Sequence, residues 1–249
     1  MAHAAEEGSF ELPVPSNRLL AGLHLVATPI GNLGDITARA VTTLRAADLI
    51  ACEDTRHSGL LLKHLEIKAR LISLNEHNEA HRIPQLLDHM RAGGSVALIS
   101  DAGMPTISDP GQRLVAAAVA AGLFIDSLPG PSAVLTALAA SGLPTTPFYF
   151  GGFLPHKKGA RGTELASALA REATSIYFES PWRILDTLGM LASAEPTRRV
   201  VVARELTKKF AEFQRGPAAQ VHAYFQAKAP KGEFTLMIAP VTPPKWLTW

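Results

Sequence analysis

Five apolar runs alternate with segments of helical periodicity along residues 22–143. The runs are rich in leucine, isoleucine, valine and alanine, and they lie at residues 23–30, 48–54, 70–75, 96–100 and 124–129. Short apolar runs bounded by glycine, proline and acidic residues are typical of buried strands. Parallel strands need crossover connections, which then cover the faces of the sheet. The alternation therefore predicts an α/β fold that begins with a five-stranded parallel sheet with helices on both faces.

The most densely punctuated stretch is VALISDAGMPTISDPG at residues 96–111, where the fourth strand ends in a loop. Asp101, Gly103 and Pro105 stop the strand, and an alanine-rich helical run follows Gly111. Asp109 is predicted to be the N-cap of that helix, with Pro110 at its first position. In an open α/β sheet such a loop lies at the carboxyl end of a strand, where ligands bind. The stretch is therefore the first candidate for a binding site.

Helix ends elsewhere carry similar signals. Asp35 is predicted to cap the helix after the first strand, and Asp54 or Thr55 the helix after the second. Ser132 is predicted to start the fifth helix, which Gly142 and Pro144 end. The third helix, at residues 79–93, is predicted to be interrupted near its start by Pro84.

A change of composition at residues 144–161 marks a predicted domain boundary, because prolines, glycines and aromatics replace the aliphatic pattern. We predict a disordered tail at residues 1–21, an N-terminal α/β domain at residues 22–146 and a C-terminal domain at residues 147–249. Strands and helices in the C-terminal part do not alternate strictly, which predicts a mixed α/β sheet with antiparallel pairs.

Composition narrows the class of protein further. Cys52 is the single cysteine, which excludes an internal disulfide framework and fits a cytoplasmic protein. No apolar run reaches the roughly 18 residues of a membrane span, so no membrane partner is expected. Residues 1–149 hold 10 Lys+Arg against 14 Asp+Glu, whereas residues 150–249 hold 14 against 8. A polyanion would meet the basic second part, although a solvated charged face explains the difference equally well.

Several familiar catalytic motifs are missing. The turn IGNLGD at residues 30–35 is neither a dinucleotide fingerprint nor a P-loop. His77 and His81 are spaced as in a helical metal site, but Glu79 lies between them in the wrong place and no third ligand is near, so we expect no metal. Val134 replaces the second glycine of a nucleophile elbow, which makes a serine hydrolase an unfavourable interpretation.

Eight stretches in order carry a specific resemblance. They are LVATPIGNLGDIT, ACEDTRHSGLLLKHL, LISDAGMPTISDPG, PGPSA, FYFGGFLP, YFESPWRILDTL, VARELTKKFAEFQRG and KGEFTLMI. Together they closely resemble the ribosomal RNA small-subunit methyltransferase I family, the cytidine 2′-O-methyltransferase branch of the tetrapyrrole methylase superfamily. The similarity covers roughly residues 22–240, essentially the whole predicted ordered chain.

The resemblance implies two α/β domains with S-adenosylmethionine bound in the cleft between them. It also implies a homodimer that methylates a ribose 2′-hydroxyl in the decoding region of small-subunit (16S) rRNA, either as free RNA or in the assembled subunit. The family pattern transfers to ten cofactor-binding positions: Leu33, Asp101, Ala102, Gly103, Met104, Ser132, Ala133, Phe178, Leu206 and Glu233. Ala102 departs from the proline of the wider superfamily but matches this branch.

Charged residues at the strand ends supply the candidates for substrate contact. For catalysis we favour Glu53, Asp54 and Arg56, with either carboxylate as general base if its pKa is raised; simple pairing of the acids with Arg56 explains them equally well. The predicted RNA-binding residues are His156, Lys157, Lys158, Arg161, Arg204 and Lys208. Further candidates from the second domain are Glu179, Glu205, Arg198 and Arg199.

Two other functions remain open alternatives. A tetrapyrrole methylase acting on a small molecule would share the fold and cofactor, but it is expected to lack the basic second domain and the EDTR and RELTKK motifs. A non-catalytic RNA-binding protein could keep the fold, although the intact SDAGMP and PGPSA stretches weigh against it. Many family members carry an additional C-terminal segment, so RNA docking by such a segment is expected to be absent from a chain that stops at Trp249.

Overall fold

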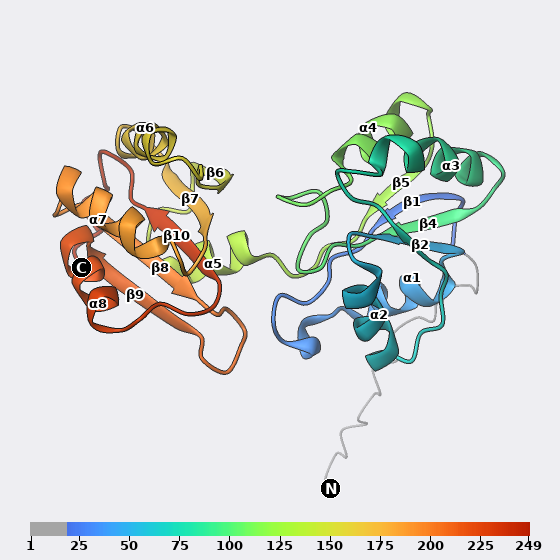
Figure 1. Ribbon diagram of the computed structural model, residues 1–249, viewed down its shortest axis with the longest axis horizontal. Coiled ribbons are helices and arrows are strands. Elements are labelled where there is room, and N and C mark those ends of the chain that lie inside the picture. Colours follow the sequence, from blue (N-terminus) through green and yellow to red (C-terminus); the bar gives the residue numbers. More distant parts are fainter. Residues whose placement is uncertain (1–18) are drawn as a thin grey trace, which may run out of the picture.

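The computed structural model describes residues 19–249 and forms two lobes, each built on a five-stranded sheet (Figure 1). Residues 1–18 of the predicted tail lie outside the described part of the chain. No helix of residues 19–249 has both the length and the apolar character needed to span a bilayer.

The first sheet is entirely parallel, as predicted, with strand order β3-β2-β4-β1-β5. Its strands are β1 Gly22–Leu25, β2 Leu49–Cys52, β3 Leu71–Ser73, β4 Ser95–Leu98 and β5 Ile125–Ser127. Its helices are α1 Ala38–Ala46, α2 Thr55–His64, α3 Glu79–Arg91 and α4 Gln112–Ala120, with a 3₁₀ turn η1 at Leu33–Asp35. The strands are shorter than the apolar runs, because the chain leaves the sheet to form loops at the carboxyl ends.

Helices cover both faces of this sheet, which confirms the doubly covered architecture. Leu86 of α3 and Leu114 of α4 pack on one face, against the buried strand residues Leu23, Val96 and Leu98. Leu44 of α1 and Leu62 of α2 pack on the other. Figure 1 shows the two helix pairs on opposite sides of the strands.

The second sheet is mixed, also as predicted, with order β6-β7-β10-β8-β9. β6 and β7 are parallel, and the other neighbouring pairs are antiparallel. The strands are β6 Phe148–Phe153, β7 Thr174–Glu179, β8 Arg199–Arg204, β9 Glu212–Pro217 and β10 Phe234–Ile238. The helices are α6 Lys158–Leu169, α7 Ile184–Ala194 and α8 Ala218–Ala227.

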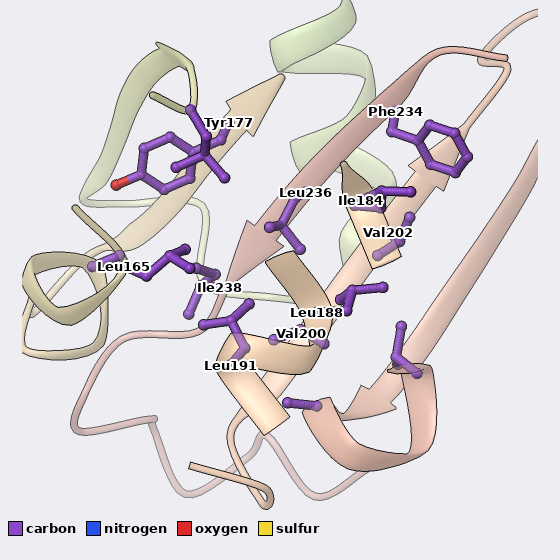
Figure 2. Close-up of a cluster of buried hydrophobic side chains, with 14 of the residues drawn as sticks. Leu165, Tyr177, Ile184, Leu188, Leu191, Val200, Val202, Phe234, Leu236 and Ile238 are labelled. Carbon is purple, nitrogen blue, oxygen red and sulfur yellow. The ribbon is translucent and has the colours of Figure 1, made fainter. Parts of the chain in front are cut away.

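Different helices cover the two faces of the second sheet. Figure 2 shows Leu188 and Leu191 of α7 packed against Val200 and Leu236 of the strands. The opposite face packs against α5 Ala133–Ser141, through its buried apolar side chains. This helix precedes the predicted domain boundary in sequence, yet it shares a core with the second sheet.

Helix starts agree with the sequence only in part. Ser132 caps α5 by accepting a bond from Leu135 N at 3.4 Å, and Asp54 caps α2. The predictions for Asp35 and Asp109 are wrong. Thr37 caps α1, because Asp35 lies within η1, and α4 begins after Gly111, whose φ of 111° provides a cap without a side chain.

Pro84 lies inside α3, which continues through it, so the predicted interruption is wrong as well. Proline removes one backbone donor and crowds the preceding turn, but flanking turns can hold a helix together across it. Leu86 and Met90 supply that support here, since both side chains are buried against the first sheet.

Candidate active site

A mainly apolar cavity of about 190 Å³ lies between the two lobes. It is closed on one side by the loop after β4 and the start of α5, and on the other by the ends of β6, β7, β8 and β10. Its lining residues are Ile30, Ala102, Gly103, Met104, Ile107, Ser108, Asp109, Ser132, Ala133, Val134, Phe153, Phe178, Glu179, Ala203, Leu206, Glu233, Phe234 and Thr235. Apolar walls with a few polar groups are the usual composition of a cofactor pocket.

Gly103 brings the backbone of the β4 loop close to the cavity. It pairs with Thr28 through two backbone hydrogen bonds of 2.9 and 3.0 Å, and its oxygen also accepts a bond from the Ser100 hydroxyl at 3.1 Å. Its φ is 85°, and a Cβ there would lie 3.3 Å from Ile30 Cγ2. Glycine therefore permits both the left-handed turn and the close approach of the two loops.

Strained backbone borders the cavity on both sides. Thr106 and Ser108 adopt positive φ in the β4 loop, and Glu205 and Thr207 do so on either side of Leu206. Such conformations cost of order 1–3 kcal/mol each and gather at ligand clamps. Both strained loops contribute residues to one cavity, which marks it as the candidate binding site.

An ion-pair cluster holds the second of these loops in place. Lys208 Nζ lies 2.9 Å from Glu205 Oε1 and 2.8 Å from Glu233 Oε2. Glu205 also receives the Glu233 N–H at 3.1 Å, and its own N–H donates to the Glu233 carbonyl at 3.0 Å. A Cβ on Gly31 would collide with Lys208 at 2.5 Å, so the first glycine turn lies directly against this cluster.

Of the ten predicted cofactor-binding residues, eight line the cavity: Ala102, Gly103, Met104, Ser132, Ala133, Phe178, Leu206 and Glu233. Leu33 and Asp101 are not among the lining residues. Leu33 lies in η1 and is 44% exposed. Asp101 instead lines a second, polar pocket, although it directly precedes three residues of the cavity in the sequence.

The second pocket lies at the carboxyl ends of β2, β3 and β4. Its lining residues are Glu53, Asp54, Thr55, Arg56, Ser73, Asn75, Glu76, His77 and Asp101. All three predicted catalytic residues are therefore brought together there. Asp101 Oδ1 is buried and has no hydrogen-bond partner in the described part of the protein. A buried acceptor without a donor is available to a ligand hydroxyl or amine.

Asp54 is poorly suited to accept a proton. The Arg56 guanidinium donates to both its oxygens, at 3.1 and 2.7 Å, and the Arg56 N–H donates at 2.8 Å. These bonds hold the pKa of Asp54 well below its usual range. Asp54 therefore caps α2 and orients Arg56, whose side chain is 90% exposed and directed away from the core.

In contrast to Asp54, both Glu53 and Asp109 have a raised pKa. Burial raises the pKa of Glu53, and the nearby Asp101 carboxylate raises it further. Burial also raises the pKa of Asp109 to about 6, with the charge of Glu53 as the next cause, while a hydrogen bond from Ser100 opposes the shift. Asp109 lines the apolar cavity and interacts with two acids of the polar pocket, so it connects the two sites.

Asp109 is the site residue that sequence reasoning missed, because its position before a helix suggested a capping role. The relevant signal was Gly111, which can start a helix with positive φ and needs no acidic cap. With the helix starting at Gln112, the Asp109 side chain is free to line the cavity instead.

The predicted second-domain contacts fall into two groups. His156, Lys157 and Lys158 are exposed at the start of α6. In contrast, Arg161 is 4% exposed and pairs with Asp186, and Arg198 is 9% exposed and bonds to the carbonyls of Leu169, Ala239 and Pro240. Both arginines therefore serve the fold, and their burial keeps them from meeting an RNA phosphate.

Other charged candidates are tied to partners within the second lobe. Glu179 is 2% exposed and accepts bonds from Ser180 N and Thr187 Oγ1 while pairing with Arg183 at 2.8 Å. Arg204 pairs with Glu212 at 3.0 Å. Arg199 is half-buried, and its guanidinium lies 5.9 Å from the ring centre of Trp249. Glu179 thus shapes the cavity wall rather than offering a free carboxylate.

A cluster of side chains that could bind a metal ion would be another kind of functional site. Within residues 19–249 no group of three or more His, Cys, Asp or Glu side chains is arranged to hold a metal ion. His77 lies in the polar pocket, whereas His81 bonds to Gln85 at 3.1 Å.

Comparison with known proteins gives a consistent result. A sequence model of the Tetrapyrrole (Corrin/Porphyrin) Methylases matches residues 22–222. A protein of Streptococcus pyogenes named Ribosomal RNA small subunit methyltransferase I is 48% identical over 217 residues, which cover 87% of this chain and 76% of the relative. A protein of the same name from Synechocystis sp. is 50% identical over 222 residues, covering 89% and 80% of the two chains.

Solved structures with low sequence identity share the fold. A diphthine synthase superimposes with a TM-score of 0.71 at 12% identity, covering 90% of this chain and 92% of that one. The uroporphyrin-III-C-methyltransferase of Thermus thermophilus gives 0.60 at 22% identity, covering 89% and 95%. The fold, the family match and the identity to the named relatives lead to one conclusion: the chain belongs to the tetrapyrrole methylases and, within them, to the ribosomal RNA small subunit methyltransferase I family.

Proposed function

We propose that this protein transfers the methyl group of S-adenosylmethionine to the 2′-hydroxyl of a cytidine in the decoding region of small-subunit rRNA. The named relatives support an rRNA substrate and a methyl-transfer reaction. The observation that carries the proposal is the interlobe cavity, since eight of the residues implied for cofactor binding line it. We further propose that the protein acts in the cytoplasm as a homodimer.

The residues of the cavity fit S-adenosylmethionine. Phe178 and Leu206 offer apolar surface for an adenine ring, Ser132 offers a hydroxyl, and the backbone at Gly103 lies where no side chain intervenes. Asp109 adds a carboxylate to the cavity wall, which suits a cofactor that carries a positive charge. When bound, the cofactor supplies a methyl group already activated on a sulfonium.

Asp109 is proposed as the general base for the ribose hydroxyl. A base works best when its pKa lies near the operating pH, and the pKa of about 6 places Asp109 there in its ionised form at neutrality. Glu53 raises that pKa through its charge, and Arg56, oriented by Asp54, is available to bind an RNA phosphate. These roles assign the proton transfer to the first lobe, whereas both lobes contribute to the cofactor pocket.

Mapping of 2′-O-methylation tests the proposal. Free small-subunit RNA and isolated small subunits are each incubated with the protein and labelled S-adenosylmethionine, and the product is digested and read by mass spectrometry. The expected result is one methylated cytidine in the decoding region. Methyl transfer to a tetrapyrrole instead, or no binding of S-adenosylmethionine in calorimetry, would contradict it.

A further inference from the structure

Two loops at one edge of the second sheet lie against each other. They follow β6 and β7, and because these strands are parallel, both loops leave the sheet on the same side. Leu154 N donates to the Phe178 carbonyl at 3.3 Å, and Arg183 Nη1 donates to the Leu154 carbonyl at 3.1 Å. These bonds fix the segment 153–158 beside the segment 179–183.

Each loop exposes an aromatic side chain. Phe153 is 57% exposed, lines the cofactor cavity and packs edge-on against Phe178 with ring centres 5.4 Å apart. Trp182 is 91% exposed and does not line the cavity. Across residues 19–249 no hydrogen bond or ring contact is found for its indole. Trp182 follows Glu179, a lining residue of the cavity, by three positions, and an exposed aromatic side chain in such a loop is suited to stacking on a ligand.

Basic residues next to Phe153 indicate the kind of partner. His156, Lys157 and Lys158 follow Phe153 directly and are exposed. Lys158 pairs with Asp186 at 3.7 Å, whereas Lys157 makes no ion pair within the described chain. Exposed aromatic rings next to exposed lysines are the composition of surfaces that bind single-stranded nucleic acid, where bases stack and phosphates contact the ammonium groups.

We propose that Trp182 and Phe153 form a stacking platform for unpaired RNA bases next to the methylated nucleotide, with Lys157 and Lys158 holding the adjoining phosphates. The proposal rests on the proposed function and deepens it, because it specifies that the RNA is recognised as a single strand. Bases inside a duplex are already stacked and cannot lie on an exposed ring. The occupant is therefore an unpaired segment of the substrate.

Fluorescence anisotropy with the full chain tests this. The probe is an end-labelled single-stranded RNA of decoding-region sequence, compared with the same RNA annealed to its complement. Trp182→Ala is expected to weaken single-strand binding by about 5- to 150-fold, the usual range for losing one stacked base, and Trp182→Phe to restore most of it. Trp246→Ala is the matched control, because that tryptophan is also exposed, at 60%, and lies outside both loops.

The outcomes separate this proposal from the proposed function. Unchanged single-strand binding by Trp182→Ala would overturn the platform, as would an equal loss on the duplex. Sedimentation that showed Trp182→Ala dissociating an oligomer, with RNA affinity restored at high protein concentration, would also overturn it by assigning the ring to a second copy of the chain. If the wild-type protein binds RNA through Trp182 but transfers no methyl group, the platform stands and the methylation proposal fails.

Discussion

Two adjacent carboxylates, Glu53 and Asp54, differ in the cost of keeping a negative charge. Asp54 receives three hydrogen bonds from Arg56, which stabilise its ionised form. Glu53 is partly buried and faces Asp101, so its ionised form is disfavoured. Burial, and then the charge of Glu53, raises the pKa of Asp109 to about 6, in the range useful for catalysis.

Replacement of Asp109 by asparagine tests its role as base. Asp109→Asn is expected to lower kcat for methylation by about 100- to 10,000-fold, the range for loss of a general base. In the wild type, kcat should rise tenfold per pH unit below about pH 6 and level off above it, because only ionised Asp109 accepts the proton. The pH-rate profile of Asp109→Asn should lack this rising part, the acidic limb. Wild-type kcat that stays constant from pH 5 to pH 7 would contradict the assignment.

Glu53 is expected to act through Asp109. Since the charge of Glu53 raises the pKa of Asp109, Glu53→Gln should move the acidic limb of the pH-rate profile to lower pH. Asp54→Asn should leave the limb where it is, because Asp54 is not among the charges that shift Asp109. Measurement of kcat at a series of pH values in both variants decides this. Equal displacement of the limb in the two variants would argue against a specific coupling.

Asp109 also lowers stability at neutral pH. Its pKa is about 6 in the folded protein against 3.8 for the ordinary group, so the folded state binds more protons between these values and its stability falls as the pH rises through them. Asp109→Asn is therefore expected to raise the free energy of unfolding by about 1–3 kcal/mol at pH 7. The gain should vanish below about pH 4. Urea denaturation at both pH values measures it, and an equal gain at each would contradict the linkage.

Helix caps show which parts of an element can be read from its sequence. Ser132 and Gly142 were predictable, because each lies at the only suitable residue where an apolar run begins or ends. Thr37 and Gly111 were not, since each competes with an aspartate two residues earlier. Backbone conformation decides between such neighbours. In the β4 loop, the positive φ of Thr106 and Ser108 sets the path of the chain into α4.

The cap at Gly111 is expected to tolerate no side chain. A Cβ there would lie 2.6 Å from Leu98 Cδ2, in addition to the strain of alanine at a φ of 111°. Gly93 is a matched control, because its φ is 89° and nothing lies within 4 Å of its Cβ position. Gly93→Ala should cost about 1–2 kcal/mol from strain alone, and Gly111→Ala about 1–3 kcal/mol more from overpacking. Equal losses in urea denaturation would show that Leu98 yields without cost.

At the scale of the whole molecule, the sequence predicts both sheets but not how the chain joins them. α5 is apolar on most of its surface, so periodicity does not tell which sheet it covers, and it packs on the second. The candidate site was likewise predictable in part. Local motifs identified the loops around Gly103 and Leu206, whereas the separation of Asp101 from the cavity depends on contacts between β2 and β4 that adjacency in sequence does not report.

The uneven distribution of charge gives the final prediction. The excess of basic residues lies in the second half of the chain, and Lys157 and Lys158 are exposed there beside the cavity rim formed by Phe153. Each phosphate contact to a single strand contributes about 0.7 to the slope of log affinity against log salt concentration. Lys157→Gln combined with Lys158→Gln should therefore reduce the slope for RNA binding by about 1.4. Lys63→Gln combined with Lys68→Gln removes the same charge from the first lobe and should leave the slope unchanged. If both double variants reduce the slope equally, RNA responds to net charge alone, and the contacts at the start of α6 are not specific.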